Sequence, residues 1–311
     1  MKKIFLLFTA AALSAGMVFA QDINQATDLY NNGAMELEMG NKESALNYFQ
    51  SAITEAEALG EAGAEIISNC QMMIPAVTLS LANDFIEVEN YDAAMEWLAK
   101  AEEVAKLYGD TETAEKAADK KGQVLMKKAS DLLKAKDYAN AITVYEQIMA
   151  AEPTNGRAAL QMGQAYNASG NQEKAEEAFN IAAANGQEKQ AYKQLSNLYV
   201  KKASAALKAK QTQEAYDFAI KANEYLENAN AYKLAASAAQ KMGNNAKCIE
   251  FYEKYLVVKP NAKDAAGVTF TIAALYQQMG NKAKAIENYE KVASDPQYGA
   301  GAQEQLKVLK K

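Results

Sequence analysis

Two Ser–Lys pairs in this sequence have the spacing of a nucleophile and its general base. Ser130 precedes Lys134 by four residues and Ser204 precedes Lys208 by four, so each pair would share one face of a helix. A lysine must be withdrawn from water before it loses its proton near neutral pH. Both pairs are expected on an open helical surface without an evident oxyanion hole, so we interpret them as surface residues.

The other candidates for chemistry are also weak. The neighbouring acids Glu102-Glu103 and Glu176-Glu177 should point in different directions on a helix, and we interpret them as solvated faces and not as glycosidase carboxylates. The chain has no histidine, which removes the commonest general base and metal ligand. The sequence holds no phosphate-binding loop, metal-ligand spacing or nucleotide fingerprint. We therefore predict a non-enzymatic protein with no catalytic residues, metal or cofactor.

Composition indicates an all-α fold. Ala, Leu, Lys, Glu and Gln, which are good helix formers, dominate the 311 residues, and only 4 residues are proline. The formal net charge is −6, and it becomes −8 if Lys2 and Lys3 are removed with a leader that contains no acid. A protein with this acidic surplus is a poor candidate for binding nucleic acid.

Residues 1–20 have the pattern of a secretory signal peptide. Lys2 and Lys3 precede an apolar run at residues 4–13, and Val18-Phe19-Ala20 supplies small residues at the positions that determine cleavage. The run is shorter than the about 20 apolar residues that span a bilayer. We therefore expect cleavage before Gln21, no transmembrane segment after cleavage, and a periplasmic or secreted location in a bacterium.

From residue 26 onward the sequence repeats itself. Repeats start near residues 26, 75, 122, 156, 196, 229 and 266, with spacings of 49, 47, 34, 40, 33 and 37 residues. The eighth residue of each repeat is small: Gly33, Ala82, Ala129, Gly163, Ala203, Ala236 and Ala273. The twentieth is also small: Ala45, Ala94, Ala141, Ala175, Ala215, Cys248 and Ala285. The twenty-fourth is mostly bulky: Phe49, Leu98, Tyr145, Phe179, Ala219, Tyr252 and Tyr289. Two helices could cross closely at the small residues, with the bulky side chain filling the space beside the crossing.

Turn residues recur between the two helical segments of a repeat. Glycines suited to a left-handed helix end are Gly40, Gly170, Gly243 and Gly280. Residues that can cap the next helix are Asn41, Asn90, Asp137, Asn171, Asn244 and Asn281. Pro153 and Pro260 stand where the second helix must stop. In this joint recurrence the chain resembles tetratricopeptide-repeat proteins, whose repeat has about 34 residues. The resemblance implies a right-handed α-solenoid of about seven repeats over residues 21–311, with a capping helix at 299–311.

Some segments depart from the family pattern. We expect lengthened helices within residues 56–88 and 102–134, a kink or restart at Pro75, and an extended junction at Gly186. Lys127 to Lys136 reads KKASDLLKAK and Lys201 to Lys210 reads KKASAALKAK, with eight identities in ten at the same phase of the third and fifth repeats. This near-identity indicates that a structural segment was duplicated.

The repeat pattern also predicts the roles of cysteines and tyrosines. Cys70 and Cys248 are 178 residues apart in distant repeats, and a solenoid repeat touches only its neighbours, so we expect two buried, unpaired thiols. The chain has 17 tyrosines, and most fall at core positions, including Tyr145, Tyr166, Tyr252, Tyr276 and Tyr289. We therefore expect them to serve packing more than stacking on sugars or bases.

The family resemblance implies where a ligand would bind. In this family the first helix of each repeat lines the concave groove, and the groove positions of the third to seventh repeats hold seven basic residues and no acidic one. The predicted groove residues are Lys127, Lys134, Arg157, Gln161, Gln164, Asn167, Lys201, Lys208, Lys233 and Lys241. The second helices carry many acids, so the charge is predicted to be segregated, with a cationic groove in an acidic body.

Such a groove favours a scaffold that binds a protein or an extended acidic peptide through charge-assisted hydrogen bonds. An alternative function is a binding module for an anionic glycan or cell-wall fragment. Another interpretation of the groove is a solvated lysine face without a ligand. Lys233 and Asn230 match only fragments of the Lys/Asn arrangement with which some family members bind a carboxylate.

Overall fold

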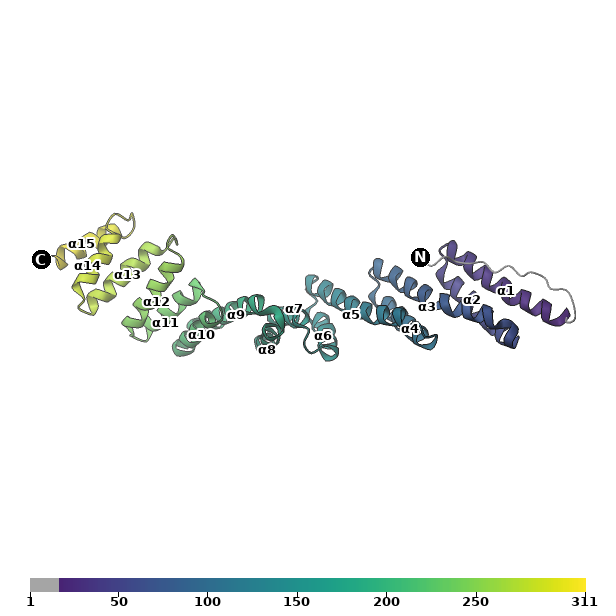
Figure 1. The fold of residues 1–311 in the computed structure, drawn as a ribbon. Helices are drawn as coiled ribbons and strands as arrows, with labels where there is room; N and C mark the ends of the chain where they lie inside the picture. Colours follow the sequence, from purple (N-terminus) through teal and green to yellow (C-terminus); the bar gives the residue numbers. More distant parts are fainter. Residues whose placement is uncertain (1–16) are drawn as a thin grey trace. The chain divides into compact units, whose positions relative to one another are not determined.

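The computed structural model describes residues 17–311, with side chains from residue 23 onward, and Figure 1 shows that this part of the chain is built from helices. The described residues contain no strand, so the predicted all-α class is confirmed. The predicted signal peptide lies almost wholly outside the described residues and stays a prediction.

The helices follow one another as pairs joined by short turns. The pairs are α1 (Met17–Glu38) and α2 (Lys42–Glu57), α3 (Ala64–Glu87) and α4 (Tyr91–Leu107), α5 (Thr111–Lys134) and α6 (Tyr138–Ala151), α7 (Gly156–Ser169) and α8 (Gln172–Ala182), α9 (Glu188–Lys208) and α10 (Thr212–Tyr225), α11 (Ala229–Lys241) and α12 (Asn245–Val258), and α13 (Ala265–Gln278) and α14 (Lys282–Lys291). The last helix is α15 (Gly299–Leu309), at the place predicted for the cap. Short helical turns at Gly60–Gly63 and Ala183–Gln187 precede α3 and α9.

The chain forms two compact units, Met1–Ile148 and Met149–Lys311, which meet in the sequence within α6. In the first unit each helix from α1 to α5 packs on the next, around one core that contains Phe49 and Cys70 and another that contains Leu98 and Val124. In the second unit each helix from α7 to α15 packs on the next, and its largest core extends from Ala203 to Ala302.

The two helices of a repeat cross closely at the predicted small residues. All seven residues at the twentieth position are fully buried: Ala45, Ala94, Ala141, Ala175, Ala215, Cys248 and Ala285. At Gly163 an added Cβ would lie 2.6 Å from the ring of Phe179, which fills the twenty-fourth position as predicted. Gly33 has the same relation to Phe49, at 2.8 Å. The helices of these pairs therefore meet at a distance that only glycine permits.

A left-handed residue ends the first helix of every repeat. The four predicted glycines have φ of 85° at Gly40, 93° at Gly170, 75° at Gly243 and 76° at Gly280. The same place in the other three repeats is held by Glu89, Lys136 and Lys210, with φ of 58°, 64° and 62°. These three turns lack the glycine that marks the other four in the sequence, because here the backbone adopts the left-handed conformation with a residue that has a side chain.

Most of the predicted helix caps are confirmed. Asn90, Asn171, Asn244 and Asn281 each accept a hydrogen bond from the backbone N–H three residues later. Asp137 likewise accepts one from the N–H of Asn140, at 3.3 Å. The prediction for Asn41 is wrong, because its Nδ2 donates to Glu36 Oε2 at 2.8 Å and its side chain does not cap α2.

Four predicted repeat starts, at residues 26, 75, 122 and 196, lie well inside helices that begin closer to the N-terminus. These helices are α1, α3, α5 and α9, of 22, 24, 24 and 21 residues. Pro75 is buried within α3, and the helix does not restart there. Gly186, with φ of 82°, breaks the chain between α8 and α9 as predicted. Across the described residues, we find no helix whose length and apolar character would let it span a bilayer.

Candidate functional site

The predicted groove residues belong to both compact units. Lys127 and Lys134 lie on α5 of the first unit. The other eight lie in the second unit, with Arg157, Gln161, Gln164 and Asn167 on α7, Lys201 and Lys208 on α9, and Lys233 and Lys241 on α11. Within the second unit α9 contacts both α7 and α11, so these first helices lie side by side.

In the first unit the predicted basic residues are neutralised. Lys127 Nζ lies 2.7 Å from Glu89 Oε1 and 3.1 Å from Asp131 Oδ2. Lys134 Nζ lies 2.9 Å from Asp131 Oδ1. The Tyr91 hydroxyl donates to Asp131 Oδ2 at 2.6 Å and accepts from Lys127 at 2.7 Å. These donors, the tyrosine hydroxyl first, hold the pKa of Asp131 far below its usual range. Neither lysine therefore offers an uncompensated charge to a ligand.

In the second unit four of the five predicted cations are unpaired. Arg157, Lys201, Lys208 and Lys241 are exposed, and none of them forms an ion pair within the described residues. We call these four residues the basic face. The fifth cation, Lys233, pairs with Asp264, so it does not belong to the basic face. Half-buried amides on α7, at Gln164 and Asn167, lie on the same helix as Arg157.

The predicted segregation of charge therefore holds only in part. The acids that neutralise the groove lysines do not occupy predicted groove positions. Glu89 lies in the turn before α4, Asp131 lies at another position of α5, and Asp264 lies directly before α13. The groove prediction considered only the residues expected to face the groove, so it did not include these acids.

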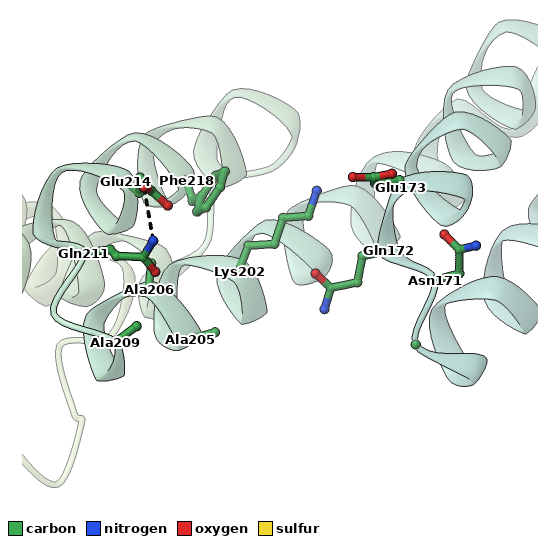
Figure 2. Close-up of a pocket in the computed structure, with 11 residues that line it drawn as sticks. Asn171, Gln172, Glu173, Lys202, Ala205, Ala206, Ala209, Gln211, Glu214 and Phe218 are labelled. Atoms are coloured by element: carbon green, nitrogen blue, oxygen red, sulfur yellow. Dashed lines mark hydrogen bonds between the residues drawn. The ribbon is translucent and has the colours of Figure 1, made fainter.

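An open depression of about 760 Å³ lies in the second unit, between the turn that joins α7 to α8 and the start of α10. Figure 2 shows Lys202 extending from α9 across it, between Gln172 and Glu173 at one end and Glu214 and Phe218 at the other. Alanines form its α9 wall: Ala205, Ala206 and Ala209. The sequence did not predict this depression.

Lys202 is held by a polar and aromatic cluster beside the depression. Its Nζ lies 2.9 Å from Glu176 Oε2 and 4.8 Å from the centre of the Tyr199 ring. The Tyr199 hydroxyl donates to Glu176, and Lys221 Nζ lies 3.3 Å from Glu176 Oε1. Burial alone would raise the pKa of Glu176, but the bonds from Tyr199 and Lys202 outweigh it and lower the pKa. The interpretation of Glu176 as part of a solvated face is therefore wrong.

Glu102 also departs from the solvated face predicted for it. Its two carboxylate oxygens lie 2.5 Å from Lys106 Nζ and 2.5 Å from Lys121 Nζ, so it connects α4 to α5. The hydrogen bonds from Lys106 and then Lys121 lower its pKa to about 2. The partner on α5 is 19 residues away, which is why helix periodicity alone could not identify it.

The Ser–Lys pairs have surroundings that do not favour catalysis. Lys134 and Lys208 are both exposed, and the Lys134 ammonium is bound to Asp131. An exposed ammonium keeps its proton near neutral pH. Among the described residues, no group of three or more Cys, Asp or Glu side chains is placed to hold a metal ion.

The predicted roles of cysteines and tyrosines are confirmed. Cys70 and Cys248 are fully buried and unpaired. Burial raises the pKa of Cys70 to about 12 and that of Cys248 to about 11. The five tyrosines predicted at core positions are at most 8% exposed: Tyr145, Tyr166, Tyr252, Tyr276 and Tyr289.

Comparison with solved structures gives several helical-repeat proteins of low similarity. MamA is 22% identical, with a TM-score of 0.34 over 57% of this chain and 95% of its own. TTC0263, a thermophilic tetratricopeptide protein of Thermus thermophilus, is 18% identical, with a TM-score of 0.28 over 60% of this chain and 98% of its own. YrrB, described as a tetratricopeptide protein with an unusual peptide-binding site, is 17% identical, with a TM-score of 0.35 over 58% and 91%. No curated protein matches the chain.

The family comparison agrees with the geometry of the repeats. The tetratricopeptide-repeat family matches residues 132–198 and again residues 267–294. The first match contains the crossing of Gly163 with Phe179, and the second contains Ala273 and Ala285. Helix pairs, close crossings and left-handed turns recur along the described residues, and the chain contains tetratricopeptide repeats at residues 132–198 and 267–294.

Proposed function

We propose that this protein is a non-enzymatic scaffold that binds a carboxylate-rich segment of a partner protein on its basic face. The observation that supports this most directly is that Arg157, Lys201, Lys208 and Lys241 are exposed without an ion-pair partner among the described residues. They come from three first helices that lie in contact. Tetratricopeptide repeats are protein-interaction modules, and stacked repeats present extended surfaces of this kind.

An extended peptide suits this arrangement of donors. Lysine and arginine side chains form short, charge-assisted hydrogen bonds with carboxylates. Arg157 and Gln164 are seven residues apart on α7, and Lys201 and Lys208 are seven apart on α9. Seven residues are about two helical turns, so the two residues of each pair lie on the same face of their helix. A segment that crosses these helices would meet cations and amides in succession, and acidic side chains along it would be recognised.

The binding test uses the full-length chain and a fluorescein-labelled decapeptide of alternating Glu and Gly. Anisotropy is measured for the wild type and for Lys201→Glu combined with Lys208→Glu. The matched control is Lys259→Glu with Lys282→Glu, which changes the net charge equally at exposed residues outside the basic face. We expect at least about a tenfold loss of affinity for the first double variant, and little change for the control.

Equal affinity of the two double variants would show that the basic face is not the binding surface. Binding should also weaken as salt is added, because exposed charges are screened over about 10 Å at 0.1 M salt. A peptide in which Gln replaces Glu should bind poorly. Thermal unfolding of each variant separates lost binding from lost folding.

The same cations could pair with the carboxylates of an anionic glycan or cell-wall fragment. Calorimetry with acidic oligosaccharides and with peptidoglycan fragments tests this second candidate. A glycan that binds more tightly than the acidic peptide, and whose binding is lost in the Lys201→Glu and Lys208→Glu variant, would favour the glycan as the ligand.

We further propose that the protein acts in the bacterial cell envelope after removal of residues 1–20. This rests on the two lysines and the apolar run at the start of the sequence. N-terminal sequencing of the protein from a periplasmic fraction should give a chain that begins at Gln21. A chain that retains Met1 in the cytosolic fraction would contradict this location.

The absence of enzymatic activity is also a proposal, based on the exposed lysines of the two Ser–Lys pairs. Any turnover by the purified protein that Ser130→Ala or Ser204→Ala abolishes would overturn it.

A further inference from the structure

Two junctions between repeats are built from matching segments, one in each compact unit. The first places Glu89–Tyr91 against α5, and the second places Gly170–Gln172 against α9. Both turns begin with a left-handed residue, with φ of 58° at Glu89 and 93° at Gly170, and continue with an asparagine that caps the next helix. The helical sides are residues 127–136 and 201–210, which differ only where Asp131 and Leu132 are replaced by Ala205 and Ala206.

The first junction is filled by its own side chains. Asp131 binds Lys127 and Lys134, four residues before it and three after it. Tyr91 lies between the turn and the helix, with its hydroxyl on Asp131 and its ring 5.3 Å from Lys127 Nζ. Glu89 completes the arrangement by binding Lys127 from the turn. Both lysines are therefore satisfied from within the chain.

The second junction lacks each of these groups. Ala205 stands in the place of Asp131, Ala206 in that of Leu132, Gln172 in that of Tyr91, and Gly170 in that of Glu89. All four replacements line the depression. Lys201 and Lys208 do not line it, but they lie four residues before and three residues after Ala205, as Lys127 and Lys134 do around Asp131. Lys201 and Lys208, the counterparts of Lys127 and Lys134, remain exposed and unpaired within the described residues.

We infer that this depression is a subsite for one acidic side chain of the bound segment, and that Ala205 is the residue that determines it. The ligand carboxylate takes the place that Asp131 fills at the first junction and pairs with Lys201 and Lys208. The space vacated by tyrosine and leucine accommodates an aromatic neighbour of that acidic residue. Glu173 and Glu214 also line the depression, so the pairing with Lys201 and Lys208 must outweigh their repulsion of the ligand carboxylate.

This inference rests on the proposed function, because it assigns one contact of the same acidic segment. It adds a chemical preference at one position of that segment: an acidic residue beside an aromatic one. It also explains why the lysines of the two nearly identical segments differ in their availability to a ligand: Ala205 replaces Asp131, which binds both lysines of the first segment, and Gly170 replaces Glu89, which binds Lys127.

The first experiment measures lysine availability without any peptide. The full chain is treated briefly with acetic anhydride, and acetylation at each lysine is quantified by mass spectrometry. In the wild type, Lys201 and Lys208 should react several-fold faster than Lys127 and Lys134, because amines in ion pairs are less nucleophilic. Ala205→Asp should slow Lys201 and Lys208, whereas Ala205→Asn, of similar size but uncharged, should not. Asp131→Ala should accelerate Lys127 and Lys134.

The second experiment measures binding of a labelled decapeptide with one Tyr-Glu pair in a Gly-Ser background, with Tyr-Gln as its control. Ala205→Asp should weaken binding of the Tyr-Glu peptide by at least about tenfold, and Ala205→Asn by no more than about threefold. Equal losses in the two variants would overturn the carboxylate assignment, since only the shape of the depression would then matter.

The outcomes separate the two proposals. If the wild type binds neither the Tyr-Glu peptide nor the alternating Glu-Gly peptide, both the proposed function and this subsite are overturned. If the wild type binds the Glu-Gly peptide and Ala205→Asp leaves the affinity for both peptides unchanged, the basic face stands and only the subsite is overturned.

Discussion

At the scale of single residues, the turns at Glu89, Lys136 and Lys210 hold a left-handed backbone without glycine. A side chain in this conformation brings Cβ too close to the next carbonyl oxygen, at a cost of about 1–2 kcal/mol. Four other repeats place glycine at the same position, so the fold itself requires the turn.

Replacing Lys210 by glycine should therefore stabilise the protein. We expect a gain of about 0.5–1 kcal/mol, since the relief of strain exceeds the extra freedom that glycine gives the unfolded chain. Urea denaturation followed by circular dichroism gives the change in midpoint. Gly170→Ala, at the same turn of the preceding repeat, should lower the midpoint. A lower midpoint for Lys210→Gly would contradict the argument.

The close approach at Gly163 gives a second residue-scale prediction. An alanine Cβ would lie 2.6 Å from the Phe179 ring, so Gly163→Ala should destabilise the protein by about 1–3 kcal/mol through overpacking. The matched control is Gly301→Ala in α15, where the added carbon would meet Phe270 at an ordinary 3.4 Å. The control should be neutral or slightly stabilising in the same denaturation assay. Similar losses for both variants would exclude overpacking as the cause.

At this scale, a contact could be predicted when its two residues belong to the same repeat. The crossing of Gly163 with Phe179 was predictable, because both residues belong to one repeat and their types recur. The neutralisation of Lys127 by Glu89 and that of Lys233 by Asp264 involve residues 38 and 31 positions apart. The environment of Glu176 depends on Tyr199 and Lys221, which come from two other helices. Sequence periodicity carries no information about such pairs.

At the scale of helices, Glu102 connects two consecutive elements, α4 and α5, by binding Lys121 as well as Lys106 on its own helix. Its pKa falls from 4.5 to about 2 in the folded chain. A carboxylate with a lowered pKa adds stability that is complete above its unfolded pKa and disappears as the pH falls through its folded pKa. The contribution of Glu102 is therefore present at neutral pH and lost between about pH 4.5 and 2.

Glu102→Gln should lower the free energy of unfolding at pH 7 by on the order of 1 kcal/mol, and the difference from the wild type should shrink towards pH 2. Urea titrations at pH 7 and at pH 2.5 provide the comparison. Glu103→Gln is the control, because Glu103 is exposed and belongs to no ion pair within the described residues. A Glu102 effect that is the same at both pH values would exclude the ionised carboxylate as its source.

The ends of a helix could be predicted where the residues of a turn mark them in the sequence. They could not be predicted where packing against neighbouring helices determines how far a helix extends. Gly109-Asp110 is such a local turn directly before α5, and the Asp110 side chain caps that helix. Pro75 suggested a kink or a restart, and α3 continues through it without a restart, packed between α2 and α4. Contacts on both sides can hold a helix through a residue that lacks one hydrogen bond, and this tertiary support is absent from a local pattern.

At the scale of the whole molecule, each compact unit contains one cysteine: Cys70 in the first and Cys248 in the second. Repeat proteins open in segments, because each repeat is stabilised mainly by its neighbours. Labelling with N-ethylmaleimide across a urea series, quantified separately for each cysteine by mass spectrometry, should give two different midpoints. Coincident midpoints would show that the two units unfold as one.

The burial of these thiols has a consequence for the behaviour of the chain under oxidising conditions. A protein with two accessible cysteines would form mixed disulfides and covalent dimers wherever oxidants are present. Both sulfur atoms are shielded by packed helices and hold their protons up to a pKa of about 11 or above, so the thiolate that starts disulfide exchange is scarce. The folded chain should therefore remain uncrosslinked in air without added reductant, and slow covalent oligomerisation on storage would be an early sign that a unit has begun to open.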